Sequence, residues 1–410
     1  MGFAGQRNAP ETPYVAALSG RRKAVALMDN AARVAKRSRE GYERGLRTKR
    51  VGGEAPSAGK GNRRSANLLV MRIGRVALES PFAIAPMAGM TDTAFRRLVK
   101  RHGGCGLVVT EMVSAEGLVR GIDRTLEYAE YTEEERPISI QIFGGDPEKM
   151  AAAAQIVEGM GADIVDVNMG CPVPKIAKHQ AGCSLMREPA HAASVIAAMA
   201  KAVKIPVTVK MRAGWNDQQR NAPELAKMVE DAGAAAVAVH GRTAAQSYSG
   251  SADWDIVAQI ADQLTIPVLG SGDCVEPEQI VERMQAGVEG VLVGRGVLRN
   301  PWILAQASDL AAGRPKRDVT PEERGRFLFD YIDLLLEERI DEARALTHDR
   351  WVVNKLRALA TYYTKGIDNG SHLRSAINSA ESLDALRRVI ASFYCLPALS
   401  ERQGVEGAIA

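Results

Sequence analysis

The stretch IVDVNMGCPVPK, from Ile164 to Lys175, decides the fold of this chain. It begins as an apolar, β-branched run and then breaks off at a Gly-Cys-Pro sequence. We interpret residues 164–169 as a buried strand, because proline and glycine end a strand. The thiol of Cys171 then lies on a loop just past the strand's carboxyl end, where barrels of parallel strands carry out their chemistry. From this position alone, the thiol is either a nucleophile or a proton donor.

Seven further apolar runs alternate with helical patterns along the chain. They are residues 82–86, 107–112, 138–143, 207–211, 237–241, 267–271 and 291–295. Continuous apolar strands are typical of a parallel sheet that is buried on both faces. Eight βα units within about 230 residues indicate an α/β fold, one closed (β/α)8 TIM barrel. A doubly wound sheet is the alternative, because a sequence does not show whether a sheet closes.

Local signals place the helices and divide the chain. Helices are expected to begin after Thr91 or Asp92, at Asp146-Pro147 and at Glu276-Pro277. We assign residues 71–316 to the barrel. The segment 317–396 has amphipathic patterns but no strand signal, so we expect a small all-helical C-terminal domain of three or four helices. Residues 1–66 form a basic extension and residues 397–410 a flexible tail.

Composition and charge limit the class of protein. The hydrophobic fraction of 46% and the charged fraction of 25% are ordinary for a globular protein. Five cysteines without a zinc-type spacing favour a reducing compartment, so we expect a cytoplasmic protein without a metal site or a membrane span. The net charge of +4 is uneven, since residues 1–64 carry +10 and the remainder −6. We favour a disordered tail for this extension; a nucleic-acid-binding arm, a targeting peptide and a start assigned upstream of Met71 are alternatives.

Polar side chains stand near the carboxyl ends of several apolar runs. Lys210 is costly to bury unless it has a partner, so it either reaches solvent or faces an anionic or electron-rich ligand. Arg212, two residues further, points the same way by strand alternation. Gln141 needs hydrogen-bond partners within an apolar strand, and His240 is either a core residue or a ligand contact.

Two glycine-rich loops follow the last two strands. They are Gly270-Ser271-Gly272-Asp273 and Gly294-Arg295-Gly296, at the position where barrels frequently hold a phosphate. The first strand ends in the turn Pro86-Met87-Ala88-Gly89, which would press its backbone against a flat ring. These features favour a planar cofactor with a phosphate. Flavin mononucleotide (FMN) fits better than a nicotinamide, because no GxGxxG follows a strand.

The ordered motifs of this chain resemble those of the tRNA-dihydrouridine synthase family, in particular its bacterial B-type branch. The motifs are PMAGMTDTAFRRL, EMVSAEGL, IQIFGGDP, DVNMGCPVPK, AGCSLM, VKMRAGW, VHGRTAAQSYSGSADW, GSGD and VGRGVLRNPW. The similarity runs from about Met71 to about Phe393 and includes YYTKGIDNGSHLRSAINSAESLDAL. The resemblance implies an FMN-binding barrel and a helical domain that binds tRNA.

The resemblance also implies roles for individual residues. Cys171 would be the proton donor. The FMN contacts would be Pro86, Met87, Ala88, Gln141, Lys210, His240, Ser271, Gly272, Asp273, Gly294 and Arg295. Ser271 departs from the family, which usually has asparagine there, so its side-chain contact is in question. The substrate contacts would be Asn168, Lys175 and Arg212 in the barrel and Lys355, Arg357 and Lys365 in the helical domain.

The residue types suit the reduction of uridine to 5,6-dihydrouridine in the D-loop of tRNA, with NADPH or NADH as reductant. A flavin can deliver a hydride to carbon 6 of uracil, and a thiol with an ordinary pKa near 8.5 is largely protonated at neutral pH and can supply the proton for carbon 5. The uracil must be flipped out to reach a barrel mouth. We expect a monomer whose partner is tRNA.

Two other functions are compatible with the sequence. The first is an FMN-dependent reductase or dehydrogenase of free pyrimidines, which would not need the helical domain. The second is a non-catalytic tRNA-binding protein. Intact Cys171 and Lys210 argue against the second, and a protein that purifies without flavin would argue for it.

Overall fold

The computed structural model describes residues 71–177, 180–337 and 347–396. The basic extension 1–66 and the tail 397–410 lie outside the described residues. Each of the eight apolar runs overlaps a strand of one parallel sheet. These strands are β3 (Phe82–Ile84), β4 (Val108–Val109), β6 (Ile138–Phe143), β7 (Ile164–Met169), β8 (Val207–Arg212), β9 (Ala236–His240), β10 (Val268–Ser271) and β11 (Gly290–Val293).

The sheet closes into a barrel. Its hydrogen-bonded order runs β3-β11-β10-β9-β8-β7-β6-β4, and the short strand β5 (Val113–Ser114) also pairs with β6. The two ends of this order meet where Ala83 pairs in parallel with Leu107, and the Ile84 N–H donates to the Leu107 carbonyl over 3.1 Å. This closure confirms the TIM barrel and excludes the doubly wound sheet.

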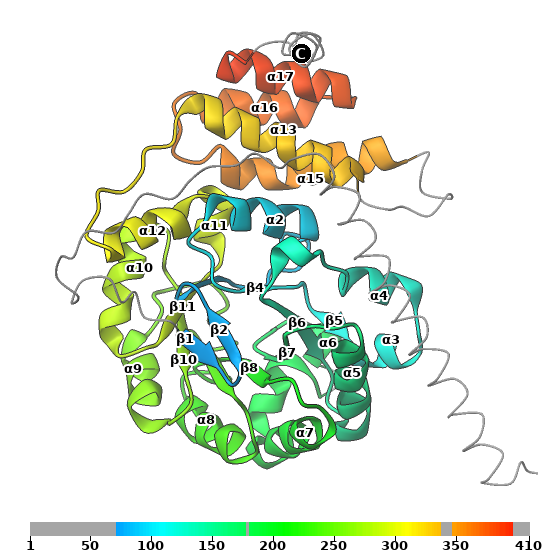
Figure 1. The fold of residues 1–410 in the computed structure, drawn as a ribbon, viewed down its shortest axis with the longest axis vertical. Coiled ribbons are helices and arrows are strands. Elements are labelled where there is room, and N and C mark those ends of the chain that lie inside the picture. The colour runs from blue at the N-terminus through cyan, green and yellow to red at the C-terminus, as the bar shows by residue number, and fades with distance from the viewer. Residues whose placement is uncertain (1–70, 178–179, 338–346, 397–410) are drawn as a thin grey trace, which may run out of the picture.

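Helices surround the barrel and begin at the expected residues (Figure 1). Asp92 and Asp146 accept backbone N–H bonds at the starts of α2 and α5, and Glu276 forms a capping box at the start of α10. The α-helices of this part are α2 (Thr93–His102), α3 (Ala115–Val119), α4 (Asp123–Tyr128), α5 (Pro147–Gly159), α6 (Pro174–Ala177), α7 (Pro189–Ala202), α8 (Ala222–Asp231), α9 (Trp254–Gln263), α10 (Pro277–Arg283), α11 (Arg295–Arg299) and α12 (Ile303–Ala311). Three 3₁₀ helices are η2 (Glu133–Glu135), η3 (Gly182–Arg187) and η4 (Met284–Ala286).

A hairpin that the sequence analysis did not predict covers one end of the barrel. It consists of β1 (Met71–Ile73) and β2 (Val76–Leu78) (Figure 1). Its apolar side chains pack with Leu107, Leu269 and Leu292, which come from the interior of the barrel. The hairpin therefore closes the amino-terminal end, so the polar residues at the carboxyl ends of the strands lie at the other end.

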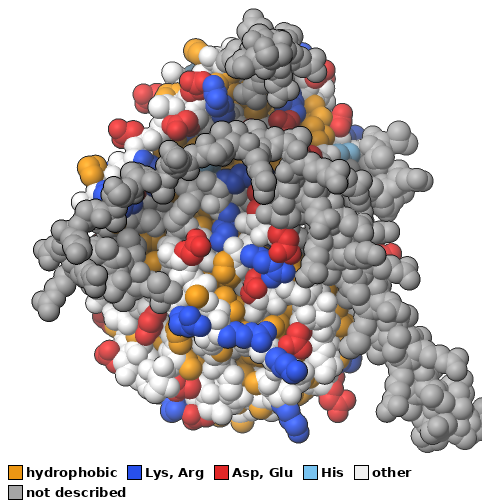
Figure 2. All heavy atoms as spheres, in the orientation of Figure 1, with side chains coloured by type: hydrophobic (Ala, Val, Ile, Leu, Met, Phe, Trp, Pro, Cys, Tyr) orange, Lys and Arg blue, Asp and Glu red, His pale blue; other side chains and the backbone are white. Residues whose placement is uncertain are grey.

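Figure 2 shows the molecule from the side of this hairpin. Where grey atoms do not cover it, basic and acidic side chains are interspersed and orange side chains are scattered. The visible part of this face therefore presents no large surface of a single charge.

The C-terminal part is helical, as expected, and packs on one side of the barrel (Figure 1). Its helices among the described residues are α13 (Pro321–Glu337), α15 (His348–Tyr363), α16 (Gly370–Ser379) and α17 (Leu383–Tyr394). Helix α13 contacts α2, and α15 contacts α11. Aromatic rings join the two parts, since Phe327 lies 6.4 Å from Phe95 and 5.5 Å from Trp302 between ring centroids. Every helix in the described part of the chain is too short or too polar to cross a membrane.

Candidate active site at the mouth of the barrel

The Cys171 loop is held by the side chain of Asn168. The Oδ1 atom of Asn168 accepts the N–H groups of Gly170 at 3.1 Å and of Cys171 at 2.9 Å. The carbonyl of Cys171 accepts the N–H of Cys183 at 3.1 Å from the other side. Cys171 itself is partly exposed, whereas Cys183 is buried. Hydrogen bonds to its backbone on both sides thus hold the residue that carries the thiol at the carboxyl end of β7.

Asn168 is in turn held by a polar group inside the barrel. Its Nδ2 donates to Gln141 Oε1 over 2.8 Å, and Gln141 Nε2 donates to Asp166 Oδ2 over 2.7 Å. Thr208 Oγ1 donates to the other oxygen of Asp166 over 2.6 Å. Burial raises the pKa of Asp166, and the hydrogen bonds from Gln141 and Thr208 oppose this rise. The predicted residues Gln141, Asn168 and Cys171 therefore belong to one connected group.

Lys210 lies beside this group, opposite Asn168 in the register of β7 and β8. Its side chain lines a cavity in the barrel interior, with Ser139, Asp166 and Thr208. Burial, followed by the charge of Arg212, lowers the pKa of Lys210 to about 8. Among the described residues, no acceptor forms a hydrogen bond or ion pair with its ammonium group. The site thus holds a cation with an unused hydrogen-bonding capacity.

His240 occupies the next strand and is neutral. Burial, followed by the nearby charges of Lys210 and Arg212, lowers its pKa to about 2. The Arg242 guanidinium lies 3.5 Å from His240 Nε2, which suits an acceptor at that nitrogen. An uncharged imidazole can hydrogen-bond to a ligand but cannot pair with a phosphate as a cation.

The loop after β10 is shaped by a glycine and a carboxylate. Gly272 has a φ of +127°, and a Cβ there would come within 2.5 Å of the Ala252 Cβ. Asp273 accepts the Ala252 N–H at 2.7 Å and the Arg242 guanidinium at 2.7 Å. Burial alone would raise the pKa of Asp273, but these two bonds outweigh it and lower the pKa. The Asp273 carboxylate is therefore occupied by protein donors, while Ser271 lies at the strand end beside His240.

The loop after β11 adds an exposed cation. Gly294 precedes α11, and a Cβ there would meet Met87 Sδ at an ordinary 3.6 Å. Arg295, the first residue of α11, is 44% exposed. Its guanidinium lies 4.7 Å from the ring centroid of Tyr248, which is itself 59% exposed. A cation and two glycine loops thus meet at the position expected for a phosphate.

The turn from Pro86 to Gly89 is held by side chains of the barrel and of the helical part. Thr91 Oγ1 accepts the Met87 N–H at 3.1 Å, and the buried Glu111 carboxylate accepts the Gly89 N–H at 2.5 Å. Lys355 of α15 donates to the Gly89 carbonyl over 2.7 Å. Ala88 is exposed between these anchors. The helical part therefore contacts the same turn that we expect to face the cofactor.

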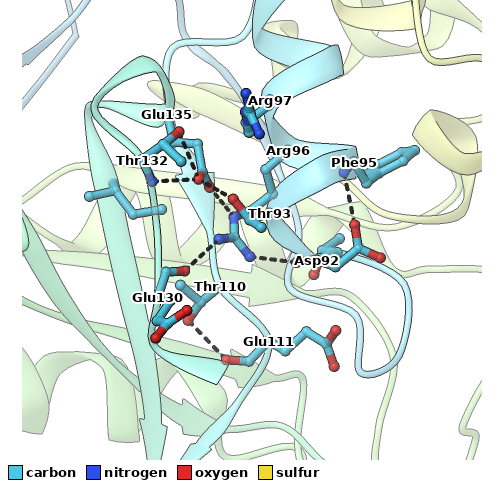
Figure 3. Close-up of polar contacts among 12 residues, drawn as sticks. Asp92, Thr93, Phe95, Arg96, Arg97, Thr110, Glu111, Glu130, Thr132 and Glu135 are labelled. Atoms are coloured by element: carbon cyan, nitrogen blue, oxygen red, sulfur yellow. Dashed lines mark hydrogen bonds and ion pairs between the residues drawn. The ribbon is translucent and has the colours of Figure 1, made fainter. Parts of the chain in front are cut away.

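Figure 3 shows the support behind this turn. The Arg96 guanidinium lies between the carboxylate of Glu135, at 2.5 Å, and the carbonyl of Glu130, at 3.0 Å. A third bond, of 2.7 Å, runs to the carbonyl of Thr91. Asp92 stands at the end of the turn and caps α2 through Phe95. A buried ion pair thus anchors the segment that carries the turn.

Arg212, a predicted substrate contact, lies inside the protein and is only 4% exposed. It donates to the carbonyls of Gly170, Thr243 and Ser247 at 2.8–3.0 Å. Arg212 therefore ties the Cys171 loop to the loop after β9. Lys175, by contrast, is exposed on α6 just after the Cys171 loop.

The three predicted tRNA contacts of the helical part have different environments. Lys355 is only 11% exposed and forms an ion pair with Asp92 at 2.7 Å, so the structure assigns it to the junction with the barrel. Arg357 is half-buried and donates to the carbonyl of Ala380 over 2.7 Å. Lys365 is exposed in the loop just after α15. The first two side chains are therefore engaged within the protein, and the third is accessible.

Comparisons with known proteins identify the family. A sequence model described as dihydrouridine synthase (Dus) matches residues 83–392. The chain belongs to the dihydrouridine synthase family. A probable tRNA-dihydrouridine synthase of Rickettsia conorii is 36% identical over 79% of this chain and 96% of its own length. A tRNA-dihydrouridine synthase B of Xanthomonas axonopodis is 36% identical over 77% and 93%, and a probable tRNA-dihydrouridine synthase of Rhodobacter capsulatus is 41% identical over 60% and 76%.

In this member of the dihydrouridine synthase family, several site residues were not predicted from the sequence. Asp166 carried a signal, because an acid two residues before Asn168 in an apolar strand points into the barrel by alternation. No sequence pattern predicted Glu111 or Arg242 as site residues, because only the fold brings Glu111 to Gly89 and Arg242 to Asp273. Within residues 71–177, 180–337 and 347–396, no group of His, Cys, Asp or Glu side chains is arranged to hold a metal ion.

Proposed function

We propose that this protein reduces a uridine in the D-loop of tRNA to 5,6-dihydrouridine, with FMN as cofactor, NADPH as reductant and Cys171 as proton donor. The supporting observation is that the loop carrying Cys171 is held at a barrel mouth that also contains Lys210, whose ammonium has no hydrogen-bond or ion-pair partner among the described residues. When bound, FMN would supply the hydride. Membership of the dihydrouridine synthase family supports the reaction, and the names of the relatives support tRNA as substrate.

The residues of the mouth fit an FMN molecule. The turn at Pro86, Met87 and Ala88 would contact the flat ring, and Gln141, Lys210 and His240 would contact its polar edge. The phosphate would lie at the two glycine loops, with the residues Ser271, Gly272, Asp273, Gly294 and Arg295. Gly272 suits this role because a Cβ would clash there, and Arg295 because it is exposed.

The thiol of Cys171 would hold the proton that uracil needs after hydride transfer. Asn168 and Arg212 keep its loop in place through bonds to the backbone, which holds the residue carrying Sγ at the mouth. Lys175 and Lys365 are exposed and would contact the RNA backbone. Neutral His240 does not compete as a proton donor, because its pKa is about 2.

The decisive test combines the full chain with FMN, NADPH and a tRNA transcript, followed by nucleoside mass spectrometry mapped by position. Dihydrouridine confined to the D-loop supports the proposal. Turnover of free uracil or orotate without tRNA would favour a reductase of free pyrimidines. A colourless protein that binds tRNA without turnover would favour a non-catalytic binding protein.

Cys171→Ala tests the proton donor. We expect this variant to keep its flavin and to lose about 100- to 10,000-fold in the rate of uridine reduction, the usual range for a positioned general acid. Cys183→Ala is the matched control, because Cys183 lies beside the same loop but is buried. Normal turnover by Cys171→Ala would exclude Cys171 as the donor.

A further inference from the structure

A continuous series of hydrogen bonds crosses three strands of the barrel and ends at Cys171. It starts at Thr208 on β8, passes through Asp166 on β7 and Gln141 on β6, and returns to Asn168 on β7. Asn168 then accepts the backbone N–H of Cys171. Gln141 faces Asp166 and Asp166 faces Thr208 in the strand register, so the barrel itself brings these side chains together.

The chemistry of the carboxylate gives this series a fixed direction. Both oxygens of Asp166 accept hydrogen bonds, one from Thr208 Oγ1 and one from Gln141 Nε2, so Gln141 turns its amide nitrogen toward Asp166. The Gln141 oxygen then faces Asn168, which must offer its own nitrogen to it. The Asn168 oxygen is left for the loop, where it accepts the N–H of Cys171. Reversing either amide would place two donors or two acceptors against each other.

We propose that Asp166 is a positioning residue, which orients the Gln141 and Asn168 amides and thereby sets the position of the Cys171 thiol. Its side chain reaches neither the loop nor the open mouth and acts through the two amides. The inference rests on the function proposed above, because it concerns the same site. The side-chain oxygen of Gln141 already accepts a hydrogen bond from Asn168, so Gln141 can offer a ligand only an N–H group.

Burial makes the arrangement sensitive to this one residue. Gln141 is 1% exposed and Asp166 6%, so bulk solvent has little access to either side chain and a lost hydrogen bond is costly. An asparagine at position 166 would keep the shape but could present either its oxygen or its NH₂ group to Gln141. The fixed direction of both amides would then be lost, and the Cys171 loop would sample more than one position.

The test compares Asp166→Asn with the wild-type full chain by two measurements. In turnover of tRNA with FMN and NADPH, we expect kcat to fall about 10- to 100-fold, as for a displaced reacting group, while KM for tRNA stays within about twofold. The second measurement is the rate at which iodoacetamide alkylates Cys171, followed by peptide mass spectrometry without flavin or tRNA. We expect this rate to change in Asp166→Asn, because the loop has moved.

Asp163→Asn is the matched control, since Asp163 precedes the same strand but bonds to Arg136 and the Ile138 N–H. It should leave both measurements at the wild-type level. Asp166→Asn with wild-type kcat and wild-type alkylation would overturn the proposal. If Asp166→Asn does not fold, Thr208→Val removes one donor to the carboxylate, and unchanged kcat and alkylation in that variant overturn the proposal instead. A wild-type protein that fails to reduce uridine refutes the proposed function, but the alkylation comparison still tests the role of Asp166.

Discussion

Replacing Arg96 with methionine removes the cation from the most buried ion pair among the described residues. Arg96 is 2% exposed and its partner Glu135 is fully buried. Glu135 keeps hydrogen bonds from Thr93 and Thr132, but its negative charge would have no counterpart. Breaking one side of a buried pair costs about 3–5 kcal/mol. We therefore expect the free energy of unfolding to fall by about 4 kcal/mol.

Urea unfolding of the full chain, followed by circular dichroism, measures this loss. The control is Arg101→Met, which removes a guanidinium that is 44% exposed and paired with Glu134. Surface pairs of this kind contribute at most about 1 kcal/mol. The double variant Arg96→Met with Glu135→Gln should be more stable than Arg96→Met alone, because it no longer buries an unpaired charge.

The same variant should also weaken FMN binding, because Arg96 donates to the Thr91 carbonyl and Thr91 holds Met87. Two results would refute the reasoning. The first is an Arg96→Met protein as stable as Arg101→Met, and the second is a double variant no more stable than Arg96→Met.

Two further predictions concern pH and the junction with the helical part. The pKa of Lys210 is lowered to about 8, so its charge is present below that pH and lost above it. FMN affinity, measured by fluorescence titration, should therefore fall as the pH rises through about 8, and Lys210→Met should remove this fall. An identical pH profile in the variant would contradict the assignment. Lys355→Met removes the cation beside Asp92 and the donor to the Gly89 carbonyl, which should lower the free energy of unfolding in urea by about 1–3 kcal/mol and weaken FMN binding. Lys365→Met, at an exposed site, should change neither quantity. Equal effects of the two variants would exclude a junction role for Lys355.

The local pattern of the sequence determined the strands and several helix starts. Residues 164–169 are rich in β-branched apolar residues and are followed by Gly170 and Pro172, which favours a buried strand, and β7 forms there. Asp92 and Asp146 cap helices because their short side chains can reach the N–H groups that a helix start leaves free. The hairpin of β1 and β2 was missed, because its three-residue strands are too short to show a period.

The partners of the polar side chains were decided by the closed barrel alone. The sequence marked Gln141 and Lys210 as polar residues of apolar strands that need partners. It did not show that Gln141 bonds to Asp166, or that Lys210 has no acceptor among the described residues. Arg212 was expected at the RNA, yet three carbonyls from two loops bury it. The physical reason is that spacing along a strand fixes which way a side chain points, whereas hydrogen-bond partners come from neighbouring strands and loops. Those neighbours are set by register and closure, which no single segment of the sequence contains.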